Sequence, residues 1–392
     1  MPEVRVLVDA TAVPDDRGGV GRYVDELVPA LVRAGADVVV ACRPSGVGAL
    51  ASSGADVHEV PDALDRRPVR LAWEQTGLPA LARRVRPDVL HSPHYTLPVA
   101  AGLPVVVTLH DATFFSDPQW HLPVKARFFR TAIRVAVARA DALVVPSAAT
   151  RDAVLAAVPS AAHHADRFHV AWHGVDRTVF RPVDEADRRR ATAAVGADRP
   201  PVVFLGTLEP RKNVVALVDG WVRACADLAD PPPLVLAGAR GWDQNIDDAL
   251  ARVPDRLRVL VPGYVPLEDL AGLLGGALVV AYPSLGEGFG LPVLEAMACG
   301  AAVLTTRRLS LPEVGGDAVA YTGTDAAAIG DALAGLLADP QRRADLGRRA
   351  LERAAGFTWD ASAAVHLTAF EQAVGARRRR RGSQPRSSSP SR

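Results

Sequence analysis

The sequence predicts an α/β protein built from two doubly wound, Rossmann-like domains. Short runs of valine, isoleucine and leucine alternate with amphipathic helical stretches, and this alternation occurs twice along the chain. Nearly continuous apolar strands indicate parallel sheets that helices cover on both faces. A chain of 392 residues is also too long for one ordinary domain core and fits two domains of roughly 180 residues each.

The first domain is expected over residues 1–180. Its predicted strands cover residues 4–9, 37–42, 88–91, 104–111, 141–147 and 168–172. Its clearest helical patterns cover residues 20–33, 123–139 and 148–157. A charged connector with prolines at both ends then leads into the second half of the chain.

The second domain is expected over residues 181–358. Its predicted strands cover residues 202–206, 234–238, 258–261, 277–284 and 301–306, and its predicted helices cover residues 214–228, 267–274, 292–299 and 325–338. A last helix is expected at residues 359–375. Residues 376–392 are rich in arginine, serine and proline and have nothing to bury, which predicts a disordered tail. Sheets of this kind bind ligands in the crevice at the carboxyl ends of their strands.

The charge is unevenly distributed. Lysine and arginine number 45 against 44 acidic residues, but the last 16 residues hold seven arginines and no acid. Subtracting those seven leaves 38 basic residues against 44 acidic ones, so the body has a charge of −6 and the tail +7. A mean hydropathy of +0.10 with 23% charged residues excludes a disordered chain.

Features that the sequence lacks indicate the cellular compartment of the protein. The amino-terminal stretch does not resemble a signal peptide, and no run reaches the roughly 20 apolar residues that span a bilayer. The three cysteines, Cys42, Cys225 and Cys299, have no metal-type spacing and suit a reducing environment. We therefore expect a cytoplasmic protein.

The basic tail leaves three roles open. The five arginines from Arg377 to Arg381 could hold the protein weakly at an anionic membrane, at about 1 kcal/mol for each basic residue. A non-specific nucleic-acid patch and a passive solubility tail are the alternatives, and no specific nucleic-acid partner is expected. The helix at 123–139 carries three arginines on one face, which is more typical of a solvated face than of a membrane-bound one.

The strongest motif is a glycine-rich loop that opens a helix. Residues 282–300 read Tyr-Pro-Ser-Leu-Gly-Glu-Gly-Phe-Gly-Leu-Pro-Val-Leu-Glu-Ala-Met-Ala-Cys-Gly after an apolar strand. The amide groups of the helix start form a seat for an anion, and the glycines let a phosphate or sugar approach the backbone. Two carboxylates, Glu287 and Glu295, flank the loop. The alternative is a structural loop with one solvated and one salt-bridged glutamate.

A second motif places cations beside a strand end. Residues 204–213 read Phe-Leu-Gly-Thr-Leu-Glu-Pro-Arg-Lys-Asn. Arg211 and Lys212 can neutralise a pyrophosphate and the charge that develops as it leaves. The alternative is a capping glutamate, Glu209, followed by two solvated bases. Lys212 is one of only two lysines in the chain, the other being Lys125.

The first domain carries two further candidates. Residues 18–23 read Gly-Gly-Val-Gly-Arg-Tyr after the first strand, but Val24 occupies the last small position of a dinucleotide fingerprint. No acid ends the second strand, so an oxidoreductase is disfavoured. His110 ends a buried strand at the carboxyl edge, where a histidine can face a ligand or be purely structural.

Together these segments resemble the retaining nucleotide-sugar glycosyltransferases of family four, which carry a Glu-x7-Glu signature. The resemblance covers most of the ordered chain and implies the GT-B fold, in which two Rossmann-like domains face a central cleft and the last helix crosses back onto the first domain. The Gly-Thr-Leu-Glu-Pro-Arg-Lys-Asn string is similar to that of mannosyl- and rhamnosyltransferase subgroups.

The family resemblance implies a role for each motif residue. Glu295 would bind the donor ribose, Glu287 and His110 the donor sugar, and Arg211 with Lys212 the diphosphate. The donor-binding set that the resemblance implies also contains Gly19, Glu209, Val265, Gly288, Phe289, Gly290 and Leu291. Thr207 replaces an arginine found in many members, which implies that diphosphate contacts are redistributed.

The resulting hypothesis is a retaining, metal-independent hexosyltransferase without a cofactor. No Asp-x-Asp pair occurs, and the histidine pairs 91/94 and 163/164 lack a third ligand. The expected partners are a nucleotide sugar, best matched by GDP-mannose, and a glycan or polyprenyl-linked acceptor. The alternatives are a non-catalytic sugar-nucleotide-binding partner of another transferase and a same-fold epimerase or phosphorylase. A phosphorylase would need a lysine for pyridoxal phosphate, and neither lysine has a suitable context.

Overall fold

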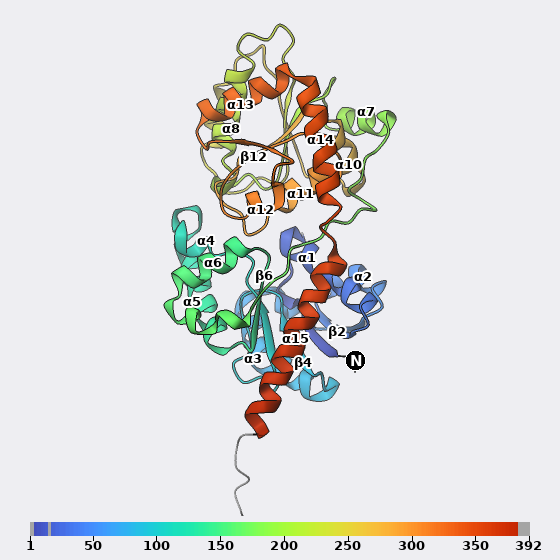
Figure 1. Ribbon diagram of the computed structural model, residues 1–392, viewed down its shortest axis with the longest axis vertical. Helices are drawn as coiled ribbons and strands as arrows, with labels where there is room; N and C mark the ends of the chain where they lie inside the picture. Colours follow the sequence, from blue (N-terminus) through green and yellow to red (C-terminus); the bar gives the residue numbers. More distant parts are fainter. Residues whose placement is uncertain (1–3, 15–16, 383–392) are drawn as a thin grey trace, which may run out of the picture. The chain divides into compact units, whose positions relative to one another are not determined.

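The computed structural model describes residues 4–14 and 17–382, and these form two compact units (Figure 1). Unit 1 contains the chain up to Gly174 together with the segment that begins at Trp359. Unit 2 contains Val175–Thr358. The chain therefore leaves unit 1, builds the whole of unit 2, and returns to finish unit 1.

Unit 1 is a seven-stranded parallel sheet in the order β3-β2-β1-β4-β5-β6-β7. Its strands are β1 (Arg5–Asp9), β2 (Asp37–Cys42), β3 (Asp56–Glu59), β4 (Val89–Ser92), β5 (Val105–Thr108), β6 (Ala142–Val145) and β7 (Phe168–Val170). The order reverses between β1 and β4, and the carboxyl end of the sheet at this switch point is where α/β proteins bind ligands.

Helices cover both faces of this sheet because successive strand residues point to opposite sides. The helices of unit 1 are α1 (Gly18–Arg33), α2 (Pro44–Ala51), α3 (Arg67–Val85), α4 (Thr113–Ser116), α5 (Pro123–Arg139), α6 (Ala148–Ala157) and α15 (Trp359–Gly382). On one face Leu7 and Leu90 pack with α3 and α5. On the other face Val6 and Val8 pack with α1 and α15, whose Phe370 is completely buried.

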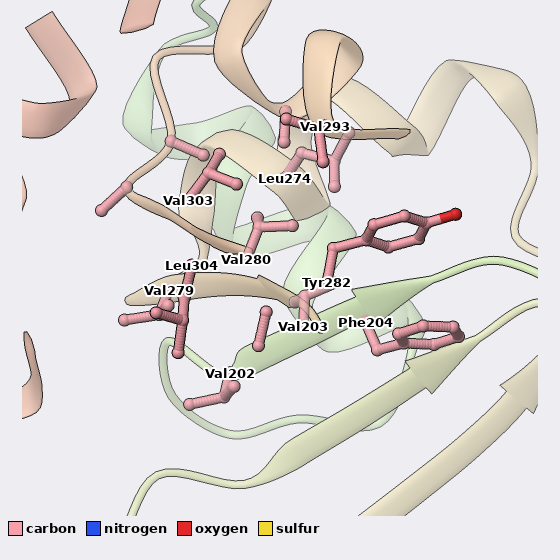
Figure 2. Close-up of a cluster of buried hydrophobic side chains, with 14 of the residues drawn as sticks. Val202, Val203, Phe204, Leu274, Val279, Val280, Tyr282, Val293, Val303 and Leu304 are labelled. Carbon is pink, nitrogen blue, oxygen red and sulfur yellow. The ribbon is translucent and has the colours of Figure 1, made fainter. Parts of the chain in front are cut away.

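Unit 2 is a six-stranded parallel sheet in the order β10-β9-β8-β11-β12-β13. Its strands are β8 (Val202–Leu205), β9 (Leu234–Ala237), β10 (Val259–Gly263), β11 (Val279–Tyr282), β12 (Val303–Thr306) and β13 (Ala320–Thr322). Its helices are α7 (Glu185–Ala194), α8 (Val214–Ala224), α9 (Ile246–Ala251), α10 (Leu267–Gly276), α11 (Leu291–Ala298), α12 (Leu311–Gly315), α13 (Ala326–Ala338) and α14 (Pro340–Ala354). Figure 2 shows Val280 of β11 beneath Leu274 of α10 and Val293 of α11.

The sequence-based prediction of two doubly wound α/β domains is confirmed, and each predicted strand corresponds to a strand of the structure. Two short strands, β3 and β13, were not predicted. In β3 the sequence Asp-Val-His-Glu has no buried residue, so no apolar run marks it. Helices α3 and α14 were also missed because charged residues and prolines obscure their apolar spacing.

Two predicted boundaries need correction. Residues 175–180 belong to unit 2 and not to the first domain, because Val175 and Phe180 are buried in its core. The tail predicted as disordered from residue 376 begins as helix, since α15 continues to Gly382. Residues 383–392 lie outside the described part of the chain.

Candidate active site

The glycine-rich loop of unit 2 connects β11 to α11 and is shaped by one glycine. Gly290 precedes α11 with a φ of +110°, a conformation that side chains other than glycine rarely adopt. A Cβ atom at this position would also lie 2.9 Å from the Leu311 side chain. Proline in the first turn of α11 costs no hydrogen bond, since its missing amide would be unpaired there. The loop therefore places the start of α11 at the carboxyl edge of the sheet.

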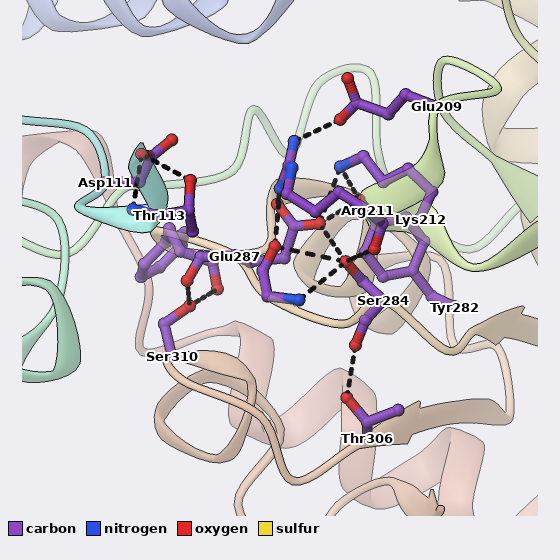
Figure 3. Close-up of polar contacts among 12 residues, drawn as sticks. Asp111, Thr113, Glu209, Arg211, Lys212, Tyr282, Ser284, Glu287, Thr306 and Ser310 are labelled. Carbon is purple, nitrogen blue, oxygen red and sulfur yellow. Dashed lines mark hydrogen bonds and ion pairs between the residues drawn. The ribbon is translucent and has the colours of Figure 1, made fainter. Parts of the chain in front are cut away.

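Hydroxyl side chains of β12 and of the residue before α12 form hydrogen bonds with the backbone of this loop. Ser310 Oγ donates hydrogen bonds to the carbonyl oxygens of Glu287 and Phe289, each at 2.8 Å. Thr306 Oγ1 donates to the carbonyl oxygen of Ser284 at 2.7 Å (Figure 3). Because these hydroxyls are buried, the loop is fixed in one conformation and its outer backbone groups are positioned in advance for a ligand.

Glu287 accepts four hydrogen bonds, two of them from cations. Its Oε1 atom accepts from Lys212 Nζ and from Ser284 Oγ, both at 2.7 Å, and from the Tyr282 hydroxyl at 3.0 Å. Its Oε2 atom accepts from Arg211 Nη1 at 2.6 Å. Both oxygens of this buried carboxylate are thus satisfied by groups from two different strand ends (Figure 3).

The charges of this cluster stabilise each other. Burial by itself would raise the pKa of Glu287, but Arg211 and Lys212 outweigh it and lower that pKa to about 2. Burial and the neighbouring Arg211 lower the pKa of Lys212, while Glu287 opposes them. Burial and Glu287 also raise the pKa of the Tyr282 hydroxyl well above its usual value, so Tyr282 stays protonated and acts as a donor.

The two cations come from a tight turn after β8. Residues Pro210–Lys212 form a single 3-10 turn that ends at Asn213, whose φ of +60° and side-chain bond to Thr324 O fix the turn's exit. Arg211 Nη2 donates to Glu209 Oε1 at 2.6 Å, so Arg211 bridges Glu209 and Glu287. The predicted residues Glu209, Arg211, Lys212 and Glu287 are therefore brought into one cluster.

The remaining predicted residues of unit 2 lie in the glycine-rich loop, in α11, or between β10 and α10. Glu295 is in the second turn of α11 and is 1% exposed. Gly288 and Phe289 lie in the loop, and Leu291 is the first residue of α11. Val265 is buried between β10 and α10. The roles of these residues toward a ligand stay predictions.

In unit 1 the predicted residues Gly19 and His110 lie near the start of α1 and just after β5. His110 Nε2 donates to the carbonyl oxygen of Pro93 at 2.7 Å, which leaves Nδ1 as the acceptor nitrogen of a neutral ring. Burial lowers the pKa of His110 despite this hydrogen bond and the nearby Asp111. The Tyr23 ring meets the His110 ring edge-on, with centroids 5.0 Å apart.

A buried hydrogen-bond chain runs from β4 to α15 through Tyr23. His366 Nδ1 donates to Ser362 O at 2.7 Å, and burial lowers the pKa of His366 to about 4, so its Nε2 accepts from the Tyr23 hydroxyl at 2.7 Å. The Tyr23 oxygen then accepts from Thr108 Oγ1 at 2.9 Å, and Thr108 accepts from His91 Nε2 at 2.9 Å. This chain joins the last helix to the strands beside His110.

Sequence reasoning missed Tyr282 and Ser284 as donors to Glu287. Both lie in the quoted motif, and their hydroxyls directly before the glycines were the available signal. It also missed Tyr23, which follows the first-domain glycines.

The described residues hold neither a cluster of metal ligands nor a helix that could span a membrane. Within residues 4–14 and 17–382 no group of three or more His, Cys, Asp or Glu side chains gathers as metal ligands. Over the same ranges no helix combines the length and hydropathy of a membrane span.

Comparison with known proteins defines the class. The family profile "Glycosyltransferase Family 4" matches residues 17–179, and "Glycosyl transferases group 1" matches residues 186–353. The sucrose-phosphate synthase of Thermosynechococcus elongatus superposes with a TM-score of 0.74 at 21% identity, covering 95% of this chain and 100% of that one. Anabaena HepE in complex with UDP-glucose superposes with a TM-score of 0.70 at 18% identity, covering 96% and 100%. The fold is that of the GT-B glycosyltransferases.

Curated relatives narrow the class to a family. An O-antigen chain mannosyltransferase B of Escherichia coli is 30% identical over 78% of this chain and 77% of its own length. A D-inositol 3-phosphate glycosyltransferase of Xylanimonas cellulosilytica is 33% identical over 92% of this chain and 93% of its own length. The chain therefore belongs to glycosyltransferase family 4.

Proposed function

We propose that this glycosyltransferase transfers a hexose from a nucleotide-diphosphate donor to a hydroxyl acceptor with retention of anomeric configuration. The observation that carries the proposal is the buried cluster in which Glu287 holds Arg211 and Lys212 side by side at the start of α11. Two fixed cations beside a helix amino terminus match the charge of a leaving diphosphate.

Each residue of the cluster has a distinct task in this mechanism. Arg211 and Lys212 stabilise the negative charge on the diphosphate as the bond to the sugar breaks. Glu287, with a pKa of about 2 and four donors around it, orients these two cations and takes up no proton at neutral pH. The proton of the acceptor hydroxyl then goes to the donor phosphate on the same face of the sugar. Glu295 binds the ribose, and the Nδ1 atom of His110 accepts from a sugar hydroxyl.

The best-supported donor is GDP-mannose, with a glycan or polyprenyl-linked acceptor. This proposal rests on the mannosyltransferase relative and on the Gly-Thr-Leu-Glu-Pro-Arg-Lys-Asn string. The second candidate acceptor is an inositol phosphate, which is favoured by relatives that match 92% of the chain. We propose no metal and no cofactor for either reaction.

The location proposed for the enzyme is the cytoplasm, with peripheral contact at the inner face of the membrane. The run of arginines from Arg377 to Arg381 in the sequence favours this contact. A second surface supports it. Leu122, just before α5, and Val124 and Phe128 in its first two turns are exposed, and residues 118–140 contain five Lys and Arg residues and no acid.

The proposal is tested by nucleotide release. The purified chain is incubated with GDP-mannose, UDP-glucose and other nucleotide sugars, with and without extracted lipid acceptors and with EDTA. We expect release to be fastest with GDP-mannose and unaffected by EDTA. Glu295→Ala should mainly raise the donor KM, and Lys212→Ala should mainly lower kcat. No release from any donor would refute the proposed function and favour a non-catalytic sugar-nucleotide-binding protein.

A further inference from the structure

A second polar cluster lies at the carboxyl edge of the unit 1 sheet. Helix α3 joins β3 to β4, so its first two turns, with Arg70 and Glu74, lie at the edge where the strands end. Asp9 is the last residue of β1 and points to the same face as Leu7, which packs against α3. Three charged side chains are thus gathered at the switch point between β1 and β4.

Glu74 is fully occupied within this cluster. Its Oε2 atom accepts from Arg70 Nη1 at 3.0 Å and from Thr96 Oγ1 at 2.5 Å. Its Oε1 atom accepts from Gln75 Nε2 at 3.0 Å, and Gln75 also donates to Leu97 O. Glu74 therefore fixes the guanidinium of Arg70 and ties it to the loop that follows β4.

Arg70 and Asp9 both keep hydrogen-bonding capacity that the described residues do not use. Arg70 is 8% exposed, and its Nε and Nη2 groups donate to no described residue. Asp9 is 4% exposed, and Thr11 occupies only its Oδ1 atom, through the backbone amide at 3.1 Å and the hydroxyl at 2.6 Å. Its Oδ2 atom accepts from no described residue.

The unused donors of Arg70 and the unused acceptor of Asp9 are close to each other but form no hydrogen bond with each other. Burial raises the pKa of Asp9, and Arg70 opposes this rise, so the two side chains lie within electrostatic range. They form no ion pair among the contacts of the described residues. Ser92 follows His91, which pairs with Val8 directly before Asp9. It is 2% exposed, and its hydroxyl also lacks a partner in the described residues.

The open atoms of Arg70 and Asp9 can be reached from outside the cluster. The buried side-chain atoms that lack a partner include the Ser92 hydroxyl but not Arg70 Nε and Nη2 or Asp9 Oδ2, so these three atoms keep contact with solvent. A well-packed apolar cluster would hold α3 to the sheet at least as well. A ligand group that accepts from Arg70 and donates to Asp9 would satisfy both. A sugar hydroxyl does both at once, whereas a phosphate group is mostly dianionic near pH 7, offers few protons to Asp9 and is repelled by its carboxylate.

The net charge of the cluster supports a neutral ligand. Two carboxylates and one guanidinium give a charge of −1 when both acids are ionised. His94 adds none at neutral pH, because burial together with His110 and Arg70 lowers its pKa to about 3. The connection before α3 adds none either, since Asp62 and Asp65 balance Arg66 and Arg67.

We propose that Asp9 and Arg70 bind adjacent hydroxyl groups of a neutral saccharide acceptor, with Glu74 as the positioning residue for Arg70. The inference rests on the proposed sugar transfer. The ring hydroxyls of an inositol phosphate could make the same contacts, so it is the charge of −1 on the cluster that favours a neutral glycan over an inositol phosphate at this subsite. Asp9 accepts from one hydroxyl through Oδ2, and Arg70 donates to its neighbour through Nε and Nη2.

Direct binding tests the inference without requiring turnover. Saturation-transfer NMR on the full chain would measure the affinity for mannobiose and for D-inositol 3-phosphate. We expect the wild type to bind mannobiose more tightly, and Asp9→Asn and Arg70→Met each to weaken that binding about tenfold, the range for hydrogen bonds to charged groups. Asp65→Asn and Arg67→Met change exposed charges in the same connection and should bind like the wild type.

Kinetics and stability separate a binding role from a structural one. In Asp9→Asn we expect the acceptor KM to rise and a larger share of released nucleotide to come from hydrolysis instead of transfer. Lower thermal stability of Asp9→Asn and Arg70→Met with mannobiose affinity unchanged would overturn the inference. So would a wild type that binds D-inositol 3-phosphate more tightly than mannobiose. If the wild type released no nucleotide from any donor, the proposed function would be refuted. The binding measurements would still decide whether Asp9 and Arg70 bind a saccharide.

Discussion

Replacing Glu287 by glutamine should destabilise unit 2 and leave unit 1 intact. The carboxylate holds two buried cations, and its pKa falls from an ordinary value of 4.5 to about 2. At roughly 1.4 kcal/mol per pH unit, this difference corresponds to about 3 kcal/mol of stability. Because the pKa is lowered in the folded state, this contribution is complete above pH 4.5 and is lost as the pH falls toward 2.

Hydrogen exchange measured by mass spectrometry can check this magnitude in each unit separately. For Glu287→Gln we expect the opening free energy of peptides from β8 and β11 to fall by about 3 kcal/mol at pH 7. Peptides from β1 and β4 of unit 1 serve as the internal control and should be unchanged. The difference between wild type and variant in urea unfolding should shrink when the comparison is repeated near pH 3. A loss below about 1 kcal/mol, or an equal loss in both units, would contradict the reasoning.

Three further changes test other features. Gly290→Ala places a Cβ atom against Leu311 at a φ of +110°. We therefore expect the free energy of unfolding in urea to fall by about 1–3 kcal/mol and the donor KM to rise. Wild-type values for both would contradict the account of the loop. His366→Leu leaves the buried Tyr23 hydroxyl without its acceptor, so we expect the opening free energy of β1, measured by hydrogen exchange, to fall by about 1–3 kcal/mol. The same substitution in the Tyr23→Phe background should lower it by less. Deleting residues 377–392 should lower flotation with anionic vesicles severalfold and leave transfer to soluble acceptors intact. Loss of both would mean that transfer needs the end of α15, which this deletion removes.

The sequence was sufficient for the strands that carry apolar runs and for the motif residues at their ends. Parallel strands end at one edge, so Glu209, Arg211, Lys212 and Glu287 could be expected near each other from their positions alone. The donors to Glu287 could not be assigned, because Tyr282 and Lys212 are 70 residues apart and only the register of β8 beside β11 brings them together.

The cluster of Asp9, Arg70 and Glu74 could not be predicted from the sequence, for a different reason. Arg70 and Glu74 have the spacing of an ordinary exposed helical ion pair, and helix α3 itself was not predicted. Only the burial of both side chains against the end of β1 distinguishes them from a solvated pair. Likewise, an arginine run has no apolar periodicity, so the continuation of α15 to Gly382 could not be read from composition.

The return of the chain to unit 1 through α15 determines when each unit can fold during synthesis. Unit 2 is a continuous segment, so it can fold on the ribosome as soon as Thr358 has left the exit tunnel. Unit 1 is made first, but the part of its sheet face that α15 covers, beside α1, stays exposed until Trp359 and Phe370 arrive. The half of the enzyme that is translated first is therefore completed last, and a premature stop shortly before residue 359 would leave an intact unit 2 attached to an unfinished unit 1.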